Sequence, residues 1–171
     1  NRAFLAMLNY QESDVVGKTV DSLFITEPGT YESTSGGVIT IADDFFAHNS
    51  SWMAQLFKNG KIFNWETYYL QKTGKAVPTI QNITLIYDQT GKISRLFCVV
   101  RDLTEHKKAE ASLRLSEARF RAIAESSTDA IITSDRNNIL LFCNKAAETM
   151  FGYRQEELIG QLGDILLPER F

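Results

Sequence analysis

The 171-residue sequence has few of the residues from which disulfides, metal sites and catalytic centres are usually built. It contains two cysteines, two histidines and three prolines. Cys98 and Cys143 fall in expected strands and lack C-x-x-C or zinc-ligand spacing, so we expect buried, reduced thiols. Neither His48 nor His106 lies in a motif with a serine or cysteine nucleophile. Since phosphate-binding glycine loops are also absent, we expect no enzymatic activity from this chain itself.

Charge and long hydrophobic runs are limited as well. The formal net charge is −3, which argues against a general nucleic-acid or membrane-surface binder. No apolar run approaches the roughly 18 residues that a membrane helix needs, and the first residues do not resemble a signal peptide. We therefore expect a cytoplasmic chain with no membrane contact of its own.

The first 60 residues predict short helices separated by turns. Residues 1–9 carry apolar side chains at helical spacing, and a second short helix should end at Gly17, which suits a left-handed cap. Residues 27–37 are rich in Pro, Gly, Ser and Thr, which predicts a flexible loop. A longer helix is predicted over 42–58. The pair Asp43–Asp44 favours the start of that helix, where carboxylates are stabilised, over a metal site.

Three strands joined by short turns follow, which predicts antiparallel pairing. Their expected ranges are Ile62–Gln71, Ala76–Tyr87 and Ile93–Arg101. Period-two alternation places Phe63, Trp65 and Tyr69 on one face of the first strand.

The third strand passes almost without a loop into a long helix. Residues from about Leu103 to Glu125 contain no Gly or Pro and are rich in helix formers. Asp102 is the predicted N-cap, with Glu105 three residues later as in a capping box, and Thr104 is a second candidate cap. Movement in the sheet should therefore reach the helix directly.

One face of this helix carries a thin apolar stripe. It consists of His106, Ala109, Leu113, Ser116, Phe120 and Ile123. We expect ion pairs Glu110–Arg114 and Glu117–Arg121 on the solvated side. The stripe favours a homodimer through a coiled coil, although Ala and Ser are weak knobs. The alternative is a single helix lying on a neighbouring domain.

The chain contains an internal repeat, which appears when Asn1 is placed on Asn144 without gaps. The identical pairs are Asn1/Asn144, Ala3/Ala146, Met7/Met150, Tyr10/Tyr153, Gly17/Gly160, Asp21/Asp164 and Leu23/Leu166. The second copy begins with a hairpin, residues 129–143, that the first lacks. The first copy continues into three strands that the second lacks.

These motifs resemble the PAS domain family. The repeated Asn-x-Ala-x-x-x-Met-x-x-Tyr is similar to its helical part, and Val-Val-Arg-Asp-Leu-Thr-Glu to the end of its last strand and its signalling helix. The resemblance implies an α+β fold, with a five-stranded antiparallel sheet, short helices on one face and usually a pocket. It divides the chain into a PAS domain lacking its first two strands (1–103), a linker helix (104–127) and the start of a second PAS domain (128–171).

The resemblance also directs attention to the space between helices and sheet. Pocket candidates are Trp52, Phe57, Trp65, Tyr69, Thr79 and Gln81. Core packing is the alternative for the aromatic residues, whereas an inward-facing Gln81 needs a partner. His48 lies where haem-binding PAS domains of oxygen sensors place their iron ligand, and residues 164–170 also resemble those domains. The family's junction implies signal coupling by Arg101, Asp102 and Thr104.

The sequence thus predicts a non-catalytic sensory and dimerisation module of a bacterial signalling protein. The parent would be a sensor histidine kinase of a two-component system or a cyclic-dinucleotide enzyme, although the active-site motif of a diguanylate cyclase is absent here. The alternatives are a haem- or flavin-binding redox or gas sensor, and a ligand-free interaction module. The Asn-Cys-Arg-Phe signature of photoactive flavin relatives is absent.

The edge of the third strand predicts one further feature. The 93–101 strand would normally be flanked by a strand of its own domain, and an exposed apolar edge invites pairing. The hairpin 129–143 supplies the missing kind of element, but a helix of about 34 Å makes pairing within one chain awkward. We therefore predict a swapped dimer in which this hairpin completes the sheet of a second molecule. The competing account is that both copies are fragments.

Overall fold

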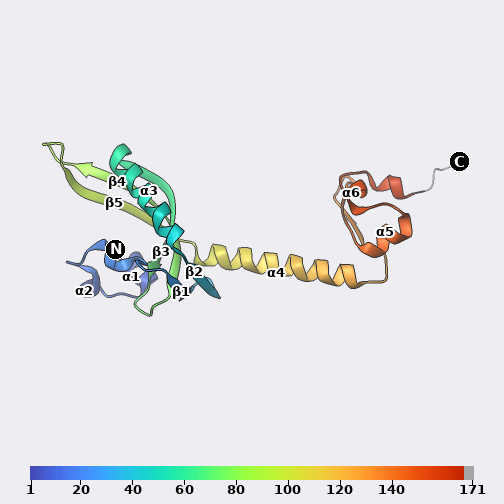
Figure 1. Cartoon of the computed structure of the whole chain (residues 1–171), viewed down its shortest axis with the longest axis horizontal. Helices are drawn as coiled ribbons and strands as arrows, with labels where there is room; N and C mark the ends of the chain where they lie inside the picture. Colours follow the sequence, from blue (N-terminus) through green and yellow to red (C-terminus); the bar gives the residue numbers. More distant parts are fainter. Residues whose placement is uncertain (168–171) are drawn as a thin grey trace. The chain divides into compact units, whose positions relative to one another are not determined.

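A computed structural model describes residues 1–167, apart from the side chain of Asp21. The chain forms two compact units, one up to Glu110 and one from Ala111 onward (Figure 1). The last residues of the 164–170 motif lie outside the described part. Helices and antiparallel strands occur in both units, which confirms the α+β class.

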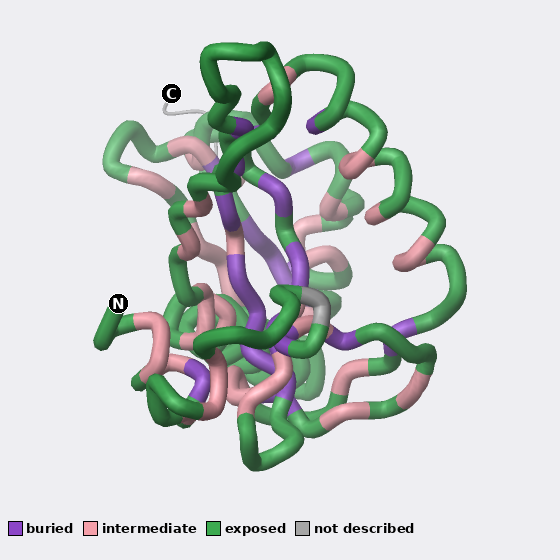
Figure 2. Tube along the Cα trace, turned by 90° about the vertical axis from the view of Figure 1, so that its left-hand side faces the viewer, coloured by how far each residue is buried: buried purple, intermediate pink, exposed green. Residues whose placement is uncertain are grey.

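The first unit is built on a three-stranded antiparallel sheet in the order β3-β4-β5. The strands are β3 (Lys61–Leu70), β4 (Ala76–Tyr87) and β5 (Ile93–Asp102). They agree with the predicted strands to within one residue at each end. Because β4 is central, it carries the most buried positions, and the purple segments of Figure 2 follow the strands.

A β-bulge decides which residues of β3 face the core. The register shifts between Ile62 and Trp65, where Asn64 has φ 55° and its N–H donates to Asn82 Oδ1 at 2.8 Å. Ile62 and Trp65 are both buried, whereas Phe63 is 53% exposed. The prediction that Phe63 shares the face of Trp65 is wrong, because the extra residue of the bulge reverses the alternation.

Helices cover the inner face of the sheet in two clusters. The elements are α1 (Arg2–Leu8), α2 (Glu12–Val15), the 3-10 helix η1 (Val20–Leu23) and α3 (Asp43–Asn59). Leu8 of α1 packs with Tyr69 and Val77, while Leu56 of α3 packs with Ile62 and Ile83. The helix predicted over 42–58 is confirmed, and its two leading aspartates lie in the first turn.

The prediction of a flexible loop at 27–37 is wrong. Strands β1 (Gly29–Glu32) and β2 (Val38–Ile41) pair as an antiparallel hairpin. The N–H of Thr34 in its turn donates to the carbonyl of Ala76 at 2.9 Å, and Ile41 packs with Ala76 in a third cluster. These tertiary contacts order a segment whose composition favours a loop.

The free edge of β5 is apolar. In the described part of the chain, β5 pairs with β4 alone. Its side chains Leu96, Phe97 and Val99 are about half exposed. The exposed apolar edge predicted for this strand is therefore present.

The long helix α4 (Thr104–Ser126) follows β5. Its apolar residues Leu113, Phe120 and Ile123 are exposed. The predicted ion pairs of Glu110 with Arg114 and of Glu117 with Arg121 do not form within α4. The ion pairs of α4 instead join residues three positions apart, namely Lys107 with Glu110 at 3.8 Å and Lys108 with Glu105 at 2.9 Å. No helix among residues 1–167 has the length and apolarity to cross a bilayer.

The second unit contains the last turns of α4, a hairpin and short helices. The elements are β6 (Ile132–Ser134), β7 (Leu140–Cys143), α5 (Lys145–Phe151), α6 (Gln155–Leu158) and the 3-10 helix η2 (Gly163–Leu166). The core is formed by Leu140, Cys143, Ala147 and Leu158, all buried. The predicted hairpin and the helix after it are thus confirmed.

The two copies of the repeat share local geometry. The side chains of Asn1 and Asn144 each accept a backbone N–H of the helix that follows. Asp14 and Glu157 accept from the N–H three residues earlier, at 2.9 and 2.7 Å. The two short helices are each followed, after one extended residue, by a glycine with φ 85°. Equivalent sequence positions therefore make equivalent structure.

Candidate ligand pocket and helix junction

The amide of Gln81 lies at the centre of the inner sheet face. Its side chain is 1% exposed. Its Oε1 accepts hydrogen bonds from the Tyr69 hydroxyl at 2.8 Å and the Cys98 thiol at 3.1 Å. Its Nε2 is buried and has no hydrogen-bond partner in the structure. The amide therefore has a satisfied acceptor and an unused donor.

The two neighbours of Gln81 both keep their protons at neutral pH. Burial raises the pKa of the Tyr69 phenol far above its ordinary value, with a further contribution from Cys98. Burial also raises the pKa of the Cys98 thiol. Both groups can therefore donate, and in this structure both donate to Gln81 Oε1.

A pocket of about 880 Å³ opens along β5 beside this triad. Phe4 and Met7 of α1 form one wall, and the stretch Leu96–Val100 of β5 forms another. Tyr69 and Asp102 also line the pocket. No Lys, Arg or His side chain is among the described residues that line it.

Three predicted pocket residues, two of them buried and one half-buried, make contacts of their own. Trp65 donates its Nε1–H to Asn49 Oδ1 at 3.1 Å. Thr79 donates its hydroxyl to the carbonyl of Thr67 at 3.1 Å. The half-buried Trp52 packs against the cluster below α3. These residues shape the surrounding core, and Tyr69 is the predicted pocket residue that lines the pocket itself.

Phe57 cannot contribute to a pocket between α3 and the sheet. Its side chain is 58% exposed, whereas the adjacent Leu56 is fully buried. Helical geometry puts Trp52, Met53 and Leu56 on one face, and Phe57 lies about 100° further around α3. The prediction for Phe57 is therefore wrong.

The residues present do not fit a haem ligated by His48. The imidazole is exposed on α3, and its Nε2 accepts a hydrogen bond from Trp52 Nε1 at 2.6 Å. This contact occupies the nitrogen lone pair that an iron ion would need. Among the described residues no cluster of His, Cys, Asp and Glu could hold a metal ion.

Two residues at the site are not evident from sequence reasoning. Phe24 stacks on Tyr69 with ring centroids 4.3 Å apart and on Trp65 at 6.2 Å. Cys98 contacts Gln81, as described above. Phe24 lies in an apolar run that indicates core, but only the strand pairing Ile83↔Cys98 puts the thiol on the inner face.

At the other end of β5, polar contacts attach the strand to α4. Asp102 Oδ1 accepts from the N–H of Thr104 at 2.7 Å, and the hydroxyl of Thr104 lies 2.7 Å from that of Thr34. The predicted capping box does not form, because α4 begins at Thr104 and Leu103, whose carbonyl accepts the N–H of Lys107, directly precedes it. Glu105 instead pairs with Lys108. Arg101 is exposed. The hairpin missed by the sequence thus participates in this junction.

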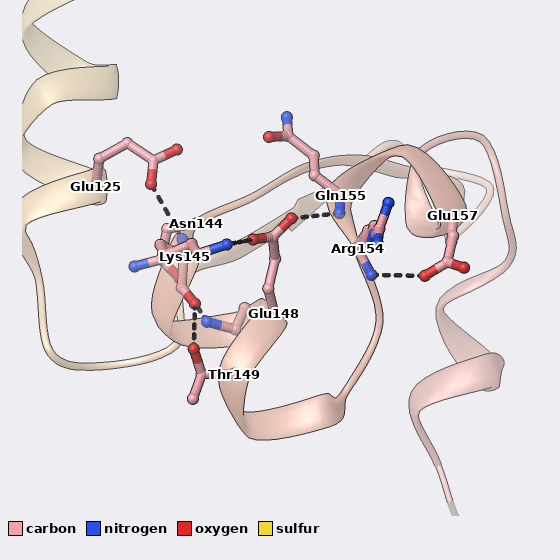
Figure 3. A network of polar contacts seen from close by, with 9 residues as sticks. Glu125, Asn144, Lys145, Glu148, Thr149, Arg154, Gln155 and Glu157 are labelled. Carbon is pink, nitrogen blue, oxygen red and sulfur yellow. Dashed lines mark hydrogen bonds and ion pairs between the residues drawn. The ribbon is translucent and has the colours of Figure 1, made fainter.

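The C-terminal end of α4 is attached to α5 by a second set of polar contacts (Figure 3). Glu125 Oε2 accepts from the N–H of Lys145 at 3.0 Å. Asn144 Nδ2 donates to the carbonyl of Ala124 at 2.7 Å. The pKa of Glu148 is lowered, first by its hydrogen bond from Lys145. Helix α4 therefore has specific side-chain contacts at both ends.

Comparison with known families identifies both units. A PAS domain family model matches residues 1–105, and a PAS fold model matches residues 118–170. The chain belongs to the PAS family. These PAS domains resemble the sensor protein FixL of Bradyrhizobium diazoefficiens, with 38% identity over 85 residues, 50% of this chain and 17% of that protein. They also resemble a probable diguanylate cyclase, DgcE, of Escherichia coli. The identity is 29% over 75 residues, which cover 44% of this chain and 7% of that protein.

Solved PAS structures resemble the chain at low identity. The PAS domain of a protein from Colwellia psychrerythraea has 17% identity and a TM-score of 0.45, covering 61% of this chain and 75% of that one. Both matched family models are of PAS domains. The chain spans less than a fifth of the length of either curated relative named above.

Proposed function

We propose that this chain is the sensory and dimerisation part of a bacterial signalling protein, either a sensor histidine kinase or a cyclic-dinucleotide enzyme. The similarity to FixL and to DgcE supports this class of parent protein. In the proposed role, the first PAS domain binds a ligand or partner, and α4 passes the change to an output domain elsewhere in the protein.

The observation that carries the proposal is that one strand serves both the pocket and the helix. Residues Leu96–Val100 of β5 line the pocket, and the same strand ends at Asp102, which accepts the N–H of Thr104 in α4. A ligand that contacts β5 differently in two positions of the strand shifts the population between them. That shift reaches the first turn of α4 without an intervening loop.

The proposed dimer forms through α4. Its exposed Leu113, Phe120 and Ile123 recur at three- and seven-residue steps, as in a helix that packs against a partner. A second form exchanges the hairpin 129–143 between molecules, and the exposed apolar edge of β5 supports this form.

The coupling role of Asp102 can be tested in the full-length protein. Asp102→Ala removes the acceptor for the Thr104 N–H, at a cost of about 0.5–2 kcal/mol, and should separate pocket occupancy from output. Asp102→Asn keeps an oxygen acceptor at the same position and should respond as the wild type does. Normal signalling by Asp102→Ala would contradict the proposal.

A further inference from the structure

The first residue of α4 is bonded to two elements that differ in their relation to the pocket. Asp102, the last residue of β5, accepts the N–H of Thr104 at 2.7 Å, and β5 lines the pocket. The hydroxyl of Thr104 lies 2.7 Å from the hydroxyl of Thr34, which belongs to the turn between β1 and β2. The β1–β2 hairpin contributes no residue to the described lining of the pocket. The start of the helix is therefore also attached to an element away from the pocket.

The turn of the β1–β2 hairpin is itself fixed to the start of β4. The N–H of Thr34 donates to the carbonyl of Ala76 at 2.9 Å. The buried Ser33 forms an isolated β-bridge with the same residue. One position further out on each segment, Lys75 and Glu32 form an ion pair at 3.2 Å. The position of the Thr34 hydroxyl is therefore set by β4, the central strand of the sheet.

The bond between Thr34 and Thr104 opposes a movement of the end of β5 relative to β4. Because the two hydroxyls lie at hydrogen-bond distance, a displacement of the helix start from the hairpin lengthens or bends this bond. Both side chains are half-buried, so water replaces a lost partner only in part. Leu103, directly before α4, adds a backbone bond to the carbonyl of Pro78 in β4 at 2.9 Å. These contacts favour the position that the start of α4 has in this structure.

We infer that Thr34 is a positioning residue for α4: its hydroxyl attaches the first turn of the helix to the β1–β2 hairpin, and this contact breaks when the helix moves in response to the pocket. The inference rests on the proposed sensory function and adds a residue of the hairpin to the coupling. Asp102 transmits a movement of β5, whereas Thr34 opposes that movement. Loss of the Thr34 hydroxyl should therefore shift the helix toward its moved position without a change at the pocket.

Hydrogen exchange of the Lys107 amide in the isolated chain measures this attachment. The N–H of Lys107 donates to the carbonyl of Leu103 across the first turn of α4. Thr34→Val removes the hydroxyl and keeps the shape of the side chain. Loss of a hydrogen bond of typical net strength should reduce the protection of this amide by about fivefold. Thr34→Ser keeps the hydroxyl and should restore the protection. Unchanged protection in Thr34→Val would overturn the inference.

Two further variants separate the contact from a general effect on the hairpin. Thr30→Val makes the same change at an exposed position of β1, and exchange of the Lys107 amide should stay as in the wild type. Thr104→Val breaks the same bond from the helix side, so it should reproduce the loss of protection and add nothing to Thr34→Val. A roughly 25-fold loss in the double variant would mean that the two hydroxyls act independently, against the inference. If Thr34→Val does not fold by circular dichroism, Thr104→Val decides.

Basal output of the full-length protein shows whether the attachment matters for signalling. It is measured at a temperature at which every variant is folded by circular dichroism, so that a loss of stability alone does not alter it. Thr34→Val should shift the basal output, and Thr34→Ser should return it to the wild-type level. An unshifted output in Thr34→Val, while Asp102→Ala uncouples the output, refutes the role of Thr34 alone. Normal signalling by Asp102→Ala, together with lost protection of Lys107 in Thr34→Val, refutes the proposed coupling and leaves the helix contact standing.

Discussion

Replacing Asn144 with alanine should selectively destabilise the second PAS unit. The side chain is fully buried, and its Nδ2 donates to the carbonyls of Ala124 and Asp129 at 2.7 and 2.9 Å. Its Oδ1 accepts from the N–H groups of Ile131 and Ala147 at 2.9 and 3.0 Å. The side-chain amide of Asn144 thus uses both N–H groups of Nδ2 and two lone pairs of Oδ1 to connect α4, the hairpin and α5.

The magnitude follows from the groups that lose a partner. Loss of the N-cap of α5 costs about 1 kcal/mol. The carbonyl of Asp129 and the N–H of Ile131 lose a partner at about 1 kcal/mol each, the low end for partly buried groups. The carbonyl of Ala124 keeps the N–H of Ser127 at 3.3 Å. We therefore expect a loss of about 3 kcal/mol, or roughly 100-fold less protection from hydrogen exchange.

The unfolding of each unit can be measured separately. Both tryptophans of the sequence, Trp52 and Trp65, lie in the first unit, so tryptophan fluorescence during denaturation reports that unit alone. Amide exchange over 140–158 reports the second unit. We expect Asn144→Ala to accelerate exchange there and to leave the fluorescence transition unchanged. The matched control is Asn1→Ala, an exposed cap at the equivalent repeat position, with a cost of at most about 1 kcal/mol. Equal effects of the two variants would refute the reasoning.

Two further predictions concern pH and assembly. The Lys72 ammonium lies 2.7 Å from the Asp14 carboxylate and lowers the pKa of that carboxyl below its ordinary value. The ion pair therefore stabilises the folded state fully above the unfolded pKa of about 3.9. This stabilisation is lost as the pH falls through the lower pKa of the folded state. Lys72→Met should weaken that acid dependence in fluorescence-monitored unfolding, and an unaltered dependence would contradict the assignment. Leu113→Glu should convert a helix-mediated dimer to a monomer, as measured by light scattering. Ile132→Pro should dissociate only a strand-exchanged dimer, because proline has no backbone N–H to donate within a strand. A dimer that persists in both variants contradicts both proposed forms.

Much of the fold is predictable from local pattern, because the strands of the sheet and α4 are long and strongly patterned. The hairpin β1–β2 shows where composition misleads. Its second strand reads Val-Ile-Thr-Ile, all β-branched, and so carries a strand signal, but the neighbouring Gly, Ser and Thr residues favour a loop. What orders the hairpin is packing on Ala76, about 40 residues away, which no local window contains.

The candidate site is less predictable than the fold, for geometric reasons. The requirement of Gln81 for a partner can be stated from sequence, since an amide amid apolar strand residues must be satisfied. The identity of the partners depends on register, because Cys98 lies in a run of apolar residues with no alternation to indicate its face. The sequence pattern predicts the helix that contains His48 and Phe57, but it does not predict which face of α3 meets the sheet. Both residues lie on the exposed face.

The bulge in β3 has a consequence for sequence length. Two residues, Phe63 and Asn64, separate the inward-facing Ile62 and Trp65. Removing one of the two restores regular alternation and leaves both large side chains facing the core, whereas a single deletion elsewhere in β3 inverts every residue beyond it. Chains that differ by one residue at this point can therefore share one core, and an alignment that places the gap even a few positions away would pair buried residues with exposed ones.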